Sequence, residues 1–187
     1  EFGSLPRDWV RQIEAVDEVW AYTEYVRQVY LASGVPEAKV KIVPCGIDPE
    51  KFRPGLAPLP LATRKTFKFL FVGGTIHRKG PDVLLKSFLR AFTADDDVCL
   101  VIKDFGGQSV YGGQTMGARI REIAARPGGP EIVHLEEELT EDQMPALYAA
   151  CDCLVHPYRG EGFGLPVLEA MACGLPVIVT QGGATDD

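Results

Sequence analysis

The chain has 187 residues, of which 46% are hydrophobic and 24% charged, and its formal net charge is −7. This length fits one domain, or one domain with part of another, and the apolar content can fill a core, which argues against a disordered chain. Because 26 acidic residues outweigh 19 Lys and Arg residues, a broad nucleic-acid interface is disfavoured, since it needs a positive surface. We therefore expect no nucleic-acid partner.

Apolar runs alternate with helical patterns along the whole chain. The first part is expected to hold a strand over residues 16–22, a helix over 24–32 and a strand over 39–43. The next segment contains five prolines, at positions 44, 49, 54, 58 and 60, and is predicted to be a linker. Strands are then expected at 68–72, 98–103, 132–135, 153–156 and 177–180, with helices at 81–92, 115–125, 143–150 and 166–173.

This alternation predicts an α/β fold, namely a Rossmann-like doubly wound parallel sheet. The strands are continuous apolar runs, as strands covered on both faces should be. Ligands of such sheets bind beyond the carboxyl ends of the strands. Four segments are expected at these ends: Gly73-Gly74, Lys103-Asp104, the residues after Leu135, and residues 156–164. The sequence therefore predicts one ligand-binding rim.

A glycine-rich turn near the C-terminus carries the strongest chemical signal. The stretch EGFGLP, which begins at Glu161, separates a strand from a short helix that should end at Gly174. Pro166 suits the first helical turn, and the free N–H groups there, with the positive end of the helix dipole, favour an anion such as phosphate. Carboxylates beside a phosphate site, here Glu161 and Glu169, are suited to accepting hydrogen bonds from sugar hydroxyls.

With seven residues between the two glutamates, this stretch resembles the E-x7-E motif of retaining glycosyltransferases with the GT-B fold. The chain resembles glycosyltransferase family four (glycosyl transferases group 1) in particular. Further segments resemble family segments and follow in the family's order: VKIVPCGID from Val40, FLFVGG from Phe69, RKG from Arg78 and DVLL from Asp82. Together the matching segments cover residues 17–187.

The resemblance implies a domain organisation and an activity. Residues 5–44 would be the tail end of the N-terminal GT-B domain, 45–65 the interdomain linker, and 66–187 a nucleotide-sugar-binding domain that is truncated at its C-terminus. The enzyme would transfer a sugar from a nucleotide diphosphate sugar to an acceptor hydroxyl with retention, as a hexosyltransferase-like enzyme of polysaccharide biosynthesis. The acceptor, a glycan, lipid or protein, would bind the missing N-terminal half. We therefore expect the isolated fragment to be inactive, and the full enzyme to be able to associate peripherally with a membrane.

The resemblance also implies residue roles. Glu169 would hold the ribose hydroxyls, Glu161 would contact the transferred sugar, and Lys79 would place a positive charge on the diphosphate, so that Glu161 and Lys79 are the expected catalytic residues. Many family members carry an arginine where this chain has Gly74, so one of the usual two cations is missing. The expected donor-binding set is Gly73, Gly74, Arg78, Lys79, Glu161, Gly162, Phe163, Gly164, Leu165 and Glu169.

Each of these residues also has an ordinary structural explanation. Lys79 fits a solvated lysine at a helix start, and Glu161 fits a loop carboxylate in water. Glu169 fits a helix glutamate that the dipole favours without any ligand. His134 and His156, which are near the expected rim, are more often packing residues than catalysts.

No cofactor and no metal is expected beyond the donor substrate. Enzymes of this kind generally lack the D-x-D metal site, and Asp95-Asp96-Asp97 should lie at the wrong end of the sheet. The five cysteines are expected to be buried thiols of a reducing compartment. Since the chain has no secretory signal and no apolar run of transmembrane length, the expected localisation is cytoplasmic.

Two other classes of function stay open. A non-catalytic nucleotide-binding module with both glutamates would have the same sequence pattern. Another GT-B enzyme, such as a nucleotide-sugar epimerase or a phosphorylase, is the second alternative. A dinucleotide dehydrogenase is the least favoured, because Val72-Gly73-Gly74 lacks the G-x-G-x-x-G spacing.

Overall fold

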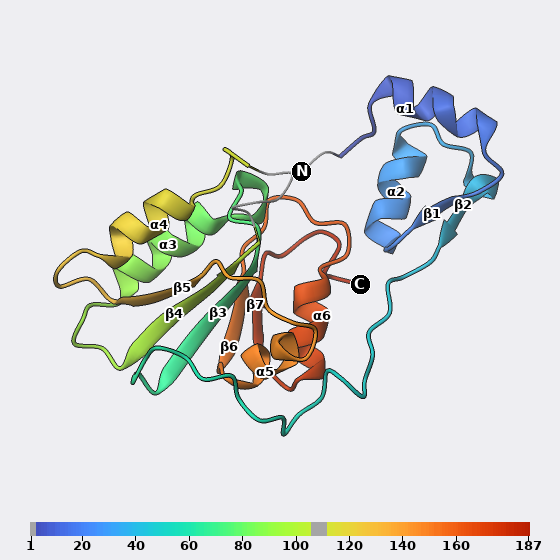
Figure 1. The fold of residues 1–187 in the computed structure, drawn as a ribbon. Helices are drawn as coiled ribbons and strands as arrows, with labels where there is room; N and C mark the ends of the chain where they lie inside the picture. The colour runs from blue at the N-terminus through green and yellow to red at the C-terminus, as the bar shows by residue number, and fades with distance from the viewer. Residues whose placement is uncertain (1–2, 106–111) are drawn as a thin grey trace. The chain divides into compact units, whose positions relative to one another are not determined.

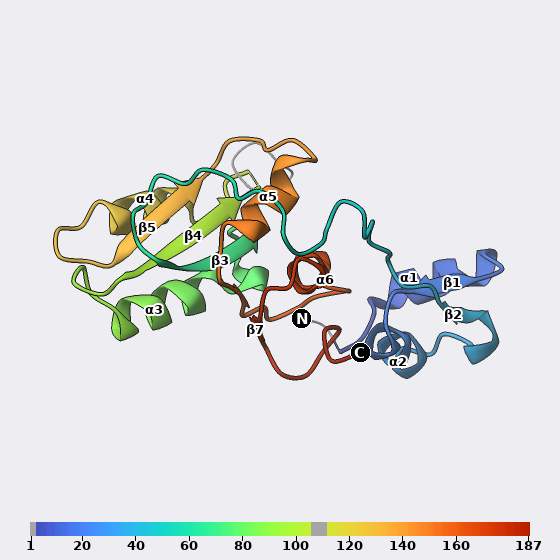
Figure 2. The same ribbon diagram turned by 90° about the horizontal axis from the view of Figure 1, so that it is seen from below.

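The computed structural model describes residues 3–105 and 112–187, and these fall into two units (Figures 1 and 2). The first unit comprises the N-terminal residues up to Gly46 together with Gly160–Leu165 and Gln181–Asp187. The second comprises Ile47–Arg159 and Pro166–Thr180. Within the described ranges, no helix is long and apolar enough to cross a membrane.

The first unit contains a small parallel sheet with short helices. Its elements are α1 (Arg7–Gln12), η1 (Ile13–Ala15), β1 (Val19–Ala21), α2 (Glu24–Ala32), η2 (Glu37–Lys39) and β2 (Val40–Ile42), with β1 and β2 paired in parallel. The predicted bounds of α2 are confirmed, and the helix begins after Thr23, whose hydroxyl accepts the Val26 N–H at 3.1 Å. Helix α1 was not predicted, because it buries none of its residues and has no side-chain cap at Pro6.

The second unit is built on a five-stranded parallel sheet in the order β5-β4-β3-β6-β7. This arrangement confirms the predicted doubly wound α/β fold. The strands are β3 (Phe67–Gly73), β4 (Val98–Asp104), β5 (Glu131–Leu135), β6 (Cys153–His156) and β7 (Val177–Val179). The helices are η3 (His77–Lys79), α3 (Pro81–Ala91), α4 (Gly117–Ala124), α5 (Gln143–Ala149) and α6 (Leu165–Ala172).

Helices cover both faces of this sheet, which explains why its strands are apolar throughout (Figures 1 and 2). On one face, Leu70 of β3 and Val101 of β4 pack with Tyr148 of α5 and Ala170 of α6. On the other face, the core is formed by residues of α3 and α4 packed against the same two strands: Phe71, Leu84, Leu85, Phe88, Leu100, Ile102, Ile120 and Ile123.

Four of the five cysteines are buried, at positions 99, 151, 153 and 173, in agreement with the prediction of core thiols. Burial raises the pKa of the Cys99 thiol to about 11 and that of Cys151 to about 12, because a thiolate would lose its hydration there. These two groups are therefore unreactive thiols of the core at neutral pH.

One predicted boundary differs from the structure for a reason that bears on the rim. The helix expected over residues 115–125 begins at Gly117. The N–H of Met116, which would otherwise be free at the helix start, donates to the carbonyl oxygen of Thr75 at 2.9 Å. The start of α4 is thus fixed by a contact with the loop that follows β3.

Gly80 provides a test of how closely the loops at this edge approach each other. It joins η3 to α3 with a φ of +72°, and a Cβ at this position would lie 1.9 Å from the carbonyl oxygen of Pro157. Gly128 has a similar φ of +76°, but its added Cβ would meet nothing within 4 Å. It is therefore a matched control for the cost of the left-handed backbone alone.

We predict that Gly128→Ala lowers the free energy of unfolding by about 1–2 kcal/mol, the cost of a Cβ in the left-handed region. Gly80→Ala should cost at least about 2 kcal/mol more, because backbone has to move to relieve the overlap with Pro157. Urea denaturation of both variants measures the difference. Equal losses in the two variants would contradict the close approach of Pro157 to Gly80.

Candidate functional site

The carboxyl ends of the strands in the second unit form one edge of the sheet, as the sequence predicted. The register of the strands pairs Gly73 of β3 with Asp104 of β4, and Lys103 of β4 with Leu135 of β5. The loop that follows β6 reaches the same edge, since the β3–β6 pairing is also parallel. Three loops from distant parts of the chain therefore meet at this rim.

The first of these loops, residues 73–80, we call the cation turn. It begins at Gly73, whose φ of +149° favours glycine, and ends at the left-handed Gly80. Between them, η3 carries Arg78 and Lys79, both half-buried. The Lys79 N–H donates to the Ile76 carbonyl at 3.0 Å, which closes the turn. Two of the expected donor-binding side chains are therefore neighbours on a single tight turn.

Arg159, in the loop after β6, attaches the cation turn to that loop and to the start of α3. Its backbone N–H donates to the Arg78 carbonyl at 2.8 Å, and its Nη1 donates to the His77 carbonyl at 2.8 Å. Its guanidinium also makes two bonds of 2.7 Å with the carboxylate of Asp82, at the start of α3. The bond from Arg159 lowers the pKa of Asp82, since it stabilises the charged form. Sequence reasoning missed Arg159.

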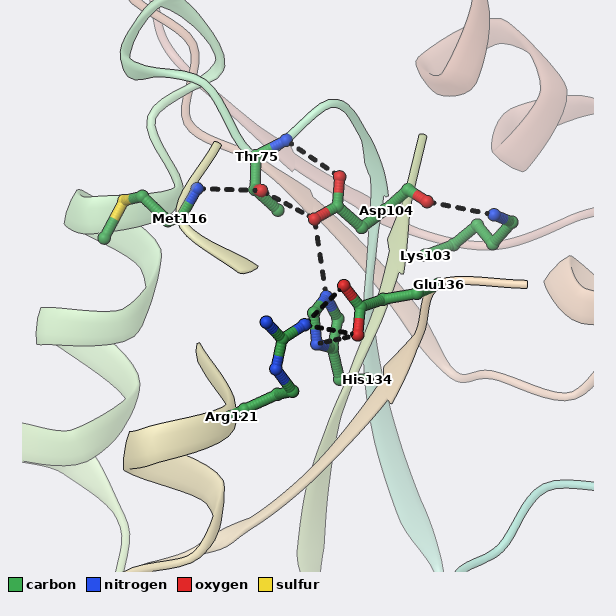
Figure 3. Close-up of polar contacts among 7 residues, drawn as sticks. All are labelled: Thr75, Lys103, Asp104, Met116, Arg121, His134 and Glu136. Atoms are coloured by element: carbon green, nitrogen blue, oxygen red, sulfur yellow. Dashed lines mark hydrogen bonds and ion pairs between the residues drawn. The ribbon is translucent and has the colours of Figure 1, made fainter. Parts of the chain in front are cut away.

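On the other side of the turn, a buried carboxylate lies at the end of β4 (Figure 3). Asp104 is 3% exposed and contacts both Thr75 and His134. The sequence predicts Asp104 at the rim but indicates no partner for it. Its neighbour Lys103 lies on the opposite side of the strand, where burial lowers the pKa of its ammonium group.

Glu169, the expected ribose-binding residue, lies on α6 against α5. The hydroxyl of Tyr148, which is fully buried, donates to Glu169 Oε2 at 2.6 Å. Burial raises the pKa of Glu169, and the bond from Tyr148 opposes this shift in part. Burial and the nearby Glu169 charge raise the pKa of Tyr148 well above its usual value, so the phenol remains the donor. Tyr148 was not singled out from the sequence, because it reads there as an ordinary helix residue.

The turn that contains Glu161 belongs to the first unit. Glu161 Oε1 accepts the N–H of Gly162 at 3.0 Å, which orients this carboxylate along its own backbone. Gly164 has a φ of +92°, so a glycine is favoured where the chain enters α6 at Leu165. Phe163 follows between the two glycines. The roles that the resemblance assigns to these residues remain predictions.

The two histidines near the rim have structural surroundings. His156 is fully buried, and its ring lies 6.1 Å from the Phe71 ring at an interplanar angle of 28°. Tyr158 packs on it at a centroid distance of 5.7 Å. His134 contacts Asp104 from β5. These contacts favour the expected packing role over a catalytic one.

A sequence model of the family described as glycosyl transferases group 1 matches residues 60–187, more than half of the chain. The D-inositol 3-phosphate glycosyltransferase of Nocardiopsis dassonvillei is 31% identical over 182 residues, which span 92% of this chain and 42% of that protein. One from Catenulispora acidiphila, D-inositol 3-phosphate glycosyltransferase 1, is 33% identical over 181 residues and is likewise covered to 42%. The chain thus spans less than half the length of these relatives.

Solved structures with the same fold are more distant in sequence. Anabaena Alr3699/HepE, crystallised with UDP-glucose, superposes with a TM-score of 0.76 at 17% identity, covering 97% of this chain and 51% of that one. The sucrose-phosphate synthase of Thermosynechococcus elongatus superposes with a TM-score of 0.74 at 23% identity, covering 94% and 43%. Both support the assignment of the second unit to the Rossmann-like C-terminal domain of the GT-B fold.

The raised pKa of Glu169 predicts how stability depends on pH. Because the folded chain retains the Glu169 proton to a higher pH than the unfolded chain, the charged carboxylate lowers stability progressively as pH rises from its ordinary pKa of 4.5. We expect Glu169→Gln to be more stable than the parent chain at pH 7, with the gain shrinking as pH falls toward 4.5.

Thermal unfolding across this pH range measures the difference. Glu50→Gln is the matched control, because it removes an exposed negative charge whereas Glu169→Gln removes a half-buried one. A stability gain that is the same at every pH, or a loss at pH 7, would contradict the burial of a charged Glu169.

Proposed function

Since the chain belongs to the glycosyl transferases group 1 family, we propose that it is the donor-binding part of a glycosyltransferase. The enzyme would move a sugar from a nucleoside diphosphate sugar to an acceptor hydroxyl, with retention at the anomeric carbon as in family four. The observation that carries this proposal is the cation turn, which presents Arg78 and Lys79 at the carboxyl edge of a doubly wound sheet.

The chemistry of the turn suits the departure of a nucleoside diphosphate. When the glycosidic bond to phosphate breaks, positive charge develops on the sugar and negative charge on the β-phosphate. Lys79 is proposed to stabilise that negative charge, with Arg78 in place of the cation missing at Gly74. Because Arg159 holds the turn through the carbonyls of His77 and Arg78, the backbone that carries these cations needs little reorganisation when the diphosphate binds.

Two carboxylates are proposed to bind hydroxyls of the donor. Glu169 is proposed to bind the ribose hydroxyls, since a carboxylate that accepts the Tyr148 hydroxyl at Oε2 has capacity for further hydrogen bonds. Glu161 is proposed to contact the transferred sugar, as the second catalytic residue beside Lys79. The backbone N–H groups of the turn from Gly162 to Leu165 are proposed to approach the phosphates or the sugar. Gly73 and Gly74 are also proposed to belong to the donor-binding set.

The names of the relatives suggest which substrates to test first. UDP and UDP-glucose are the ligands named for the Anabaena structures, so a uracil base is our first proposal for the donor. The curated relatives are named for D-inositol 3-phosphate, so a hydroxyl of a phosphorylated cyclitol is our first proposal for the acceptor. Glycan, lipid and protein hydroxyls, and a peripheral membrane association of the whole enzyme, remain further proposals.

We also propose that the enzyme works in the cytoplasm, in polysaccharide or related glycoconjugate synthesis. Five free cysteines, four of them buried, fit a reducing compartment. A non-catalytic nucleotide-binding module or a nucleotide-sugar epimerase would share the same turn, and the two experiments below separate these alternatives.

Calorimetric titration of the chain with UDP, GDP, ADP and dTDP tests donor binding. One of these nucleotides should bind, and Lys79→Ala and Glu169→Ala should each weaken it at least about tenfold, since each removes a charge-assisted contact worth about 1.5–3 kcal/mol. Lys86→Ala, which removes an exposed lysine of α3, should change nothing. Binding that both variants leave intact would contradict the assigned site.

A transfer assay separates the enzyme from the binding module. The 187-residue chain is expected to bind the donor but to transfer little or no sugar, because it spans 42% of the curated relatives. The whole protein should transfer sugar with retention, and Glu161→Gln in that protein should lower kcat. Donor binding without transfer or hydrolysis by the whole protein would favour the non-catalytic module, and an altered free nucleotide sugar would favour the epimerase.

A further inference from the structure

We infer that Asp104 is a positioning residue, which acts through Thr75 to hold the cation turn in the conformation that presents Lys79 to a diphosphate. This inference rests on the proposed function, because it deals with the same site. It adds a residue that no motif of the sequence assigns to binding.

The contact between Asp104 and Thr75 has two points (Figure 3). The backbone N–H of Thr75 donates to Asp104 Oδ1 at 3.2 Å, and its hydroxyl donates to Asp104 Oδ2 at 2.6 Å. Both residues are buried, with exposed fractions of 0% for Thr75 and 3% for Asp104. Hydrogen bonds from a neutral donor to a carboxylate are strong, and more so away from water, so this contact orients both the backbone and the side chain of Thr75.

The polar groups of Thr75 form hydrogen bonds with other residues of the chain. Its hydroxyl proton goes to Asp104, while its Oγ1 and its carbonyl oxygen lie 3.2 and 2.9 Å from the Met116 nitrogen. Thr75 is therefore a link between the turn, the end of β4 and the start of α4. This assigns it a mechanical role and separates it from the residues that contact a ligand.

Asp104 is itself supported from behind by β5 and α4. His134 Nε2 lies 3.4 Å from Asp104 Oδ2, and His134 Nδ1 lies 3.6 Å from Glu136 Oε2. Arg121 of α4 bonds to both oxygens of Glu136 at 2.6 Å. Figure 3 shows this row of side chains, from Arg121 through Glu136 and His134 to Asp104 and Thr75. The row limits the movement of the carboxylate that holds the turn.

The position of Thr75 makes the contact specific for the turn. Thr75 follows Gly73 and Gly74, where the glycine backbone is permissive, so the Asp104 contact adds to the backbone bonds that hold the start of the turn. Arg159 fixes the later part of the turn, at His77 and Arg78. Loss of the Asp104 contact would therefore release only the beginning of the turn, and would remove none of its cations. The cost should appear as a weaker diphosphate contact.

The chain contains a matched contact at the opposite end of the same two strands. Thr66, which precedes β3, donates its N–H to Asp97 Oδ1 at 2.9 Å and its hydroxyl to Asp97 Oδ2, just before β4. This pair joins the same strands with the same two-point geometry, but at their amino ends, away from the rim. Thr66→Val is therefore a control for the general structural effect of losing such a contact.

The test compares Thr75→Val with Thr75→Ser in the 187-residue chain. UDP, GDP, ADP and dTDP are titrated first, and the nucleotide that binds is carried forward with its nucleoside monophosphate. Thr75→Val should weaken the diphosphate about tenfold and the monophosphate by less than about threefold. Thr75→Ser, which keeps the hydroxyl, should bind both ligands like the parent chain, and Thr66→Val should leave both affinities unchanged.

Asp104→Asn is a second variant in case Thr75→Val does not fold, and it should show the same selective loss because an amide cannot accept both bonds of Thr75. Thr75→Val could instead weaken the diphosphate and the monophosphate equally, or Thr66→Val could show the same selective loss of diphosphate affinity. Either result would mean that the contact serves only general stability, and would overturn the inference. If the parent chain binds a diphosphate and Thr75→Val binds it equally well, the inference alone is overturned. If the parent chain binds no nucleoside diphosphate, the proposed function is overturned and the inference with it.

Discussion

The pairing of β3 with β4 is the interaction on which the rest of the second unit depends. The two strands pair in parallel over seven residues each, from Phe67 opposite Val98 to Gly73 opposite Asp104. This register buries apolar side chains on both faces and brings the carboxyl ends of the strands level with each other. The loop after β3 therefore begins beside the buried carboxylate that ends β4. A shift of one residue would turn Asp104 to the other face of the sheet and away from Thr75.

Three carboxylates of the second unit have specific partners, although the proposed ligand is an anion. Asp82 bonds to Arg159, Asp104 bonds to Thr75, and Glu169 accepts the hydroxyl of Tyr148. Each of these carboxylates has a specific partner within the protein, so its charge is partly compensated. A net charge of −7 is thus compatible with a local anion site, since Arg78 and Lys79 are neighbours on the short cation turn.

The surroundings of Glu169 bear on its proposed role in binding the donor. Burial raises the pKa of this carboxylate, because the charged form loses hydration, and the bond from Tyr148 opposes the shift in part. We propose that this burial gives the donor nucleotide a hydrogen-bond acceptor with little bound water, the Glu169 carboxylate, which Tyr148 holds in place for the ribose hydroxyls.

The sequence by itself determined the class of the fold and the position of nearly every helix and strand of the second unit. Hydrophobic runs, glycines and prolines are local signals, and β6 begins and ends where they predicted. Tertiary structure alone decided which polar groups meet in the folded chain. Thr75 and Asp104 are separated by 29 positions, Tyr148 and Glu169 by 21, and Asp82 and Arg159 by 77. No local periodicity encodes such pairs, because they depend on the order and register in which the strands assemble.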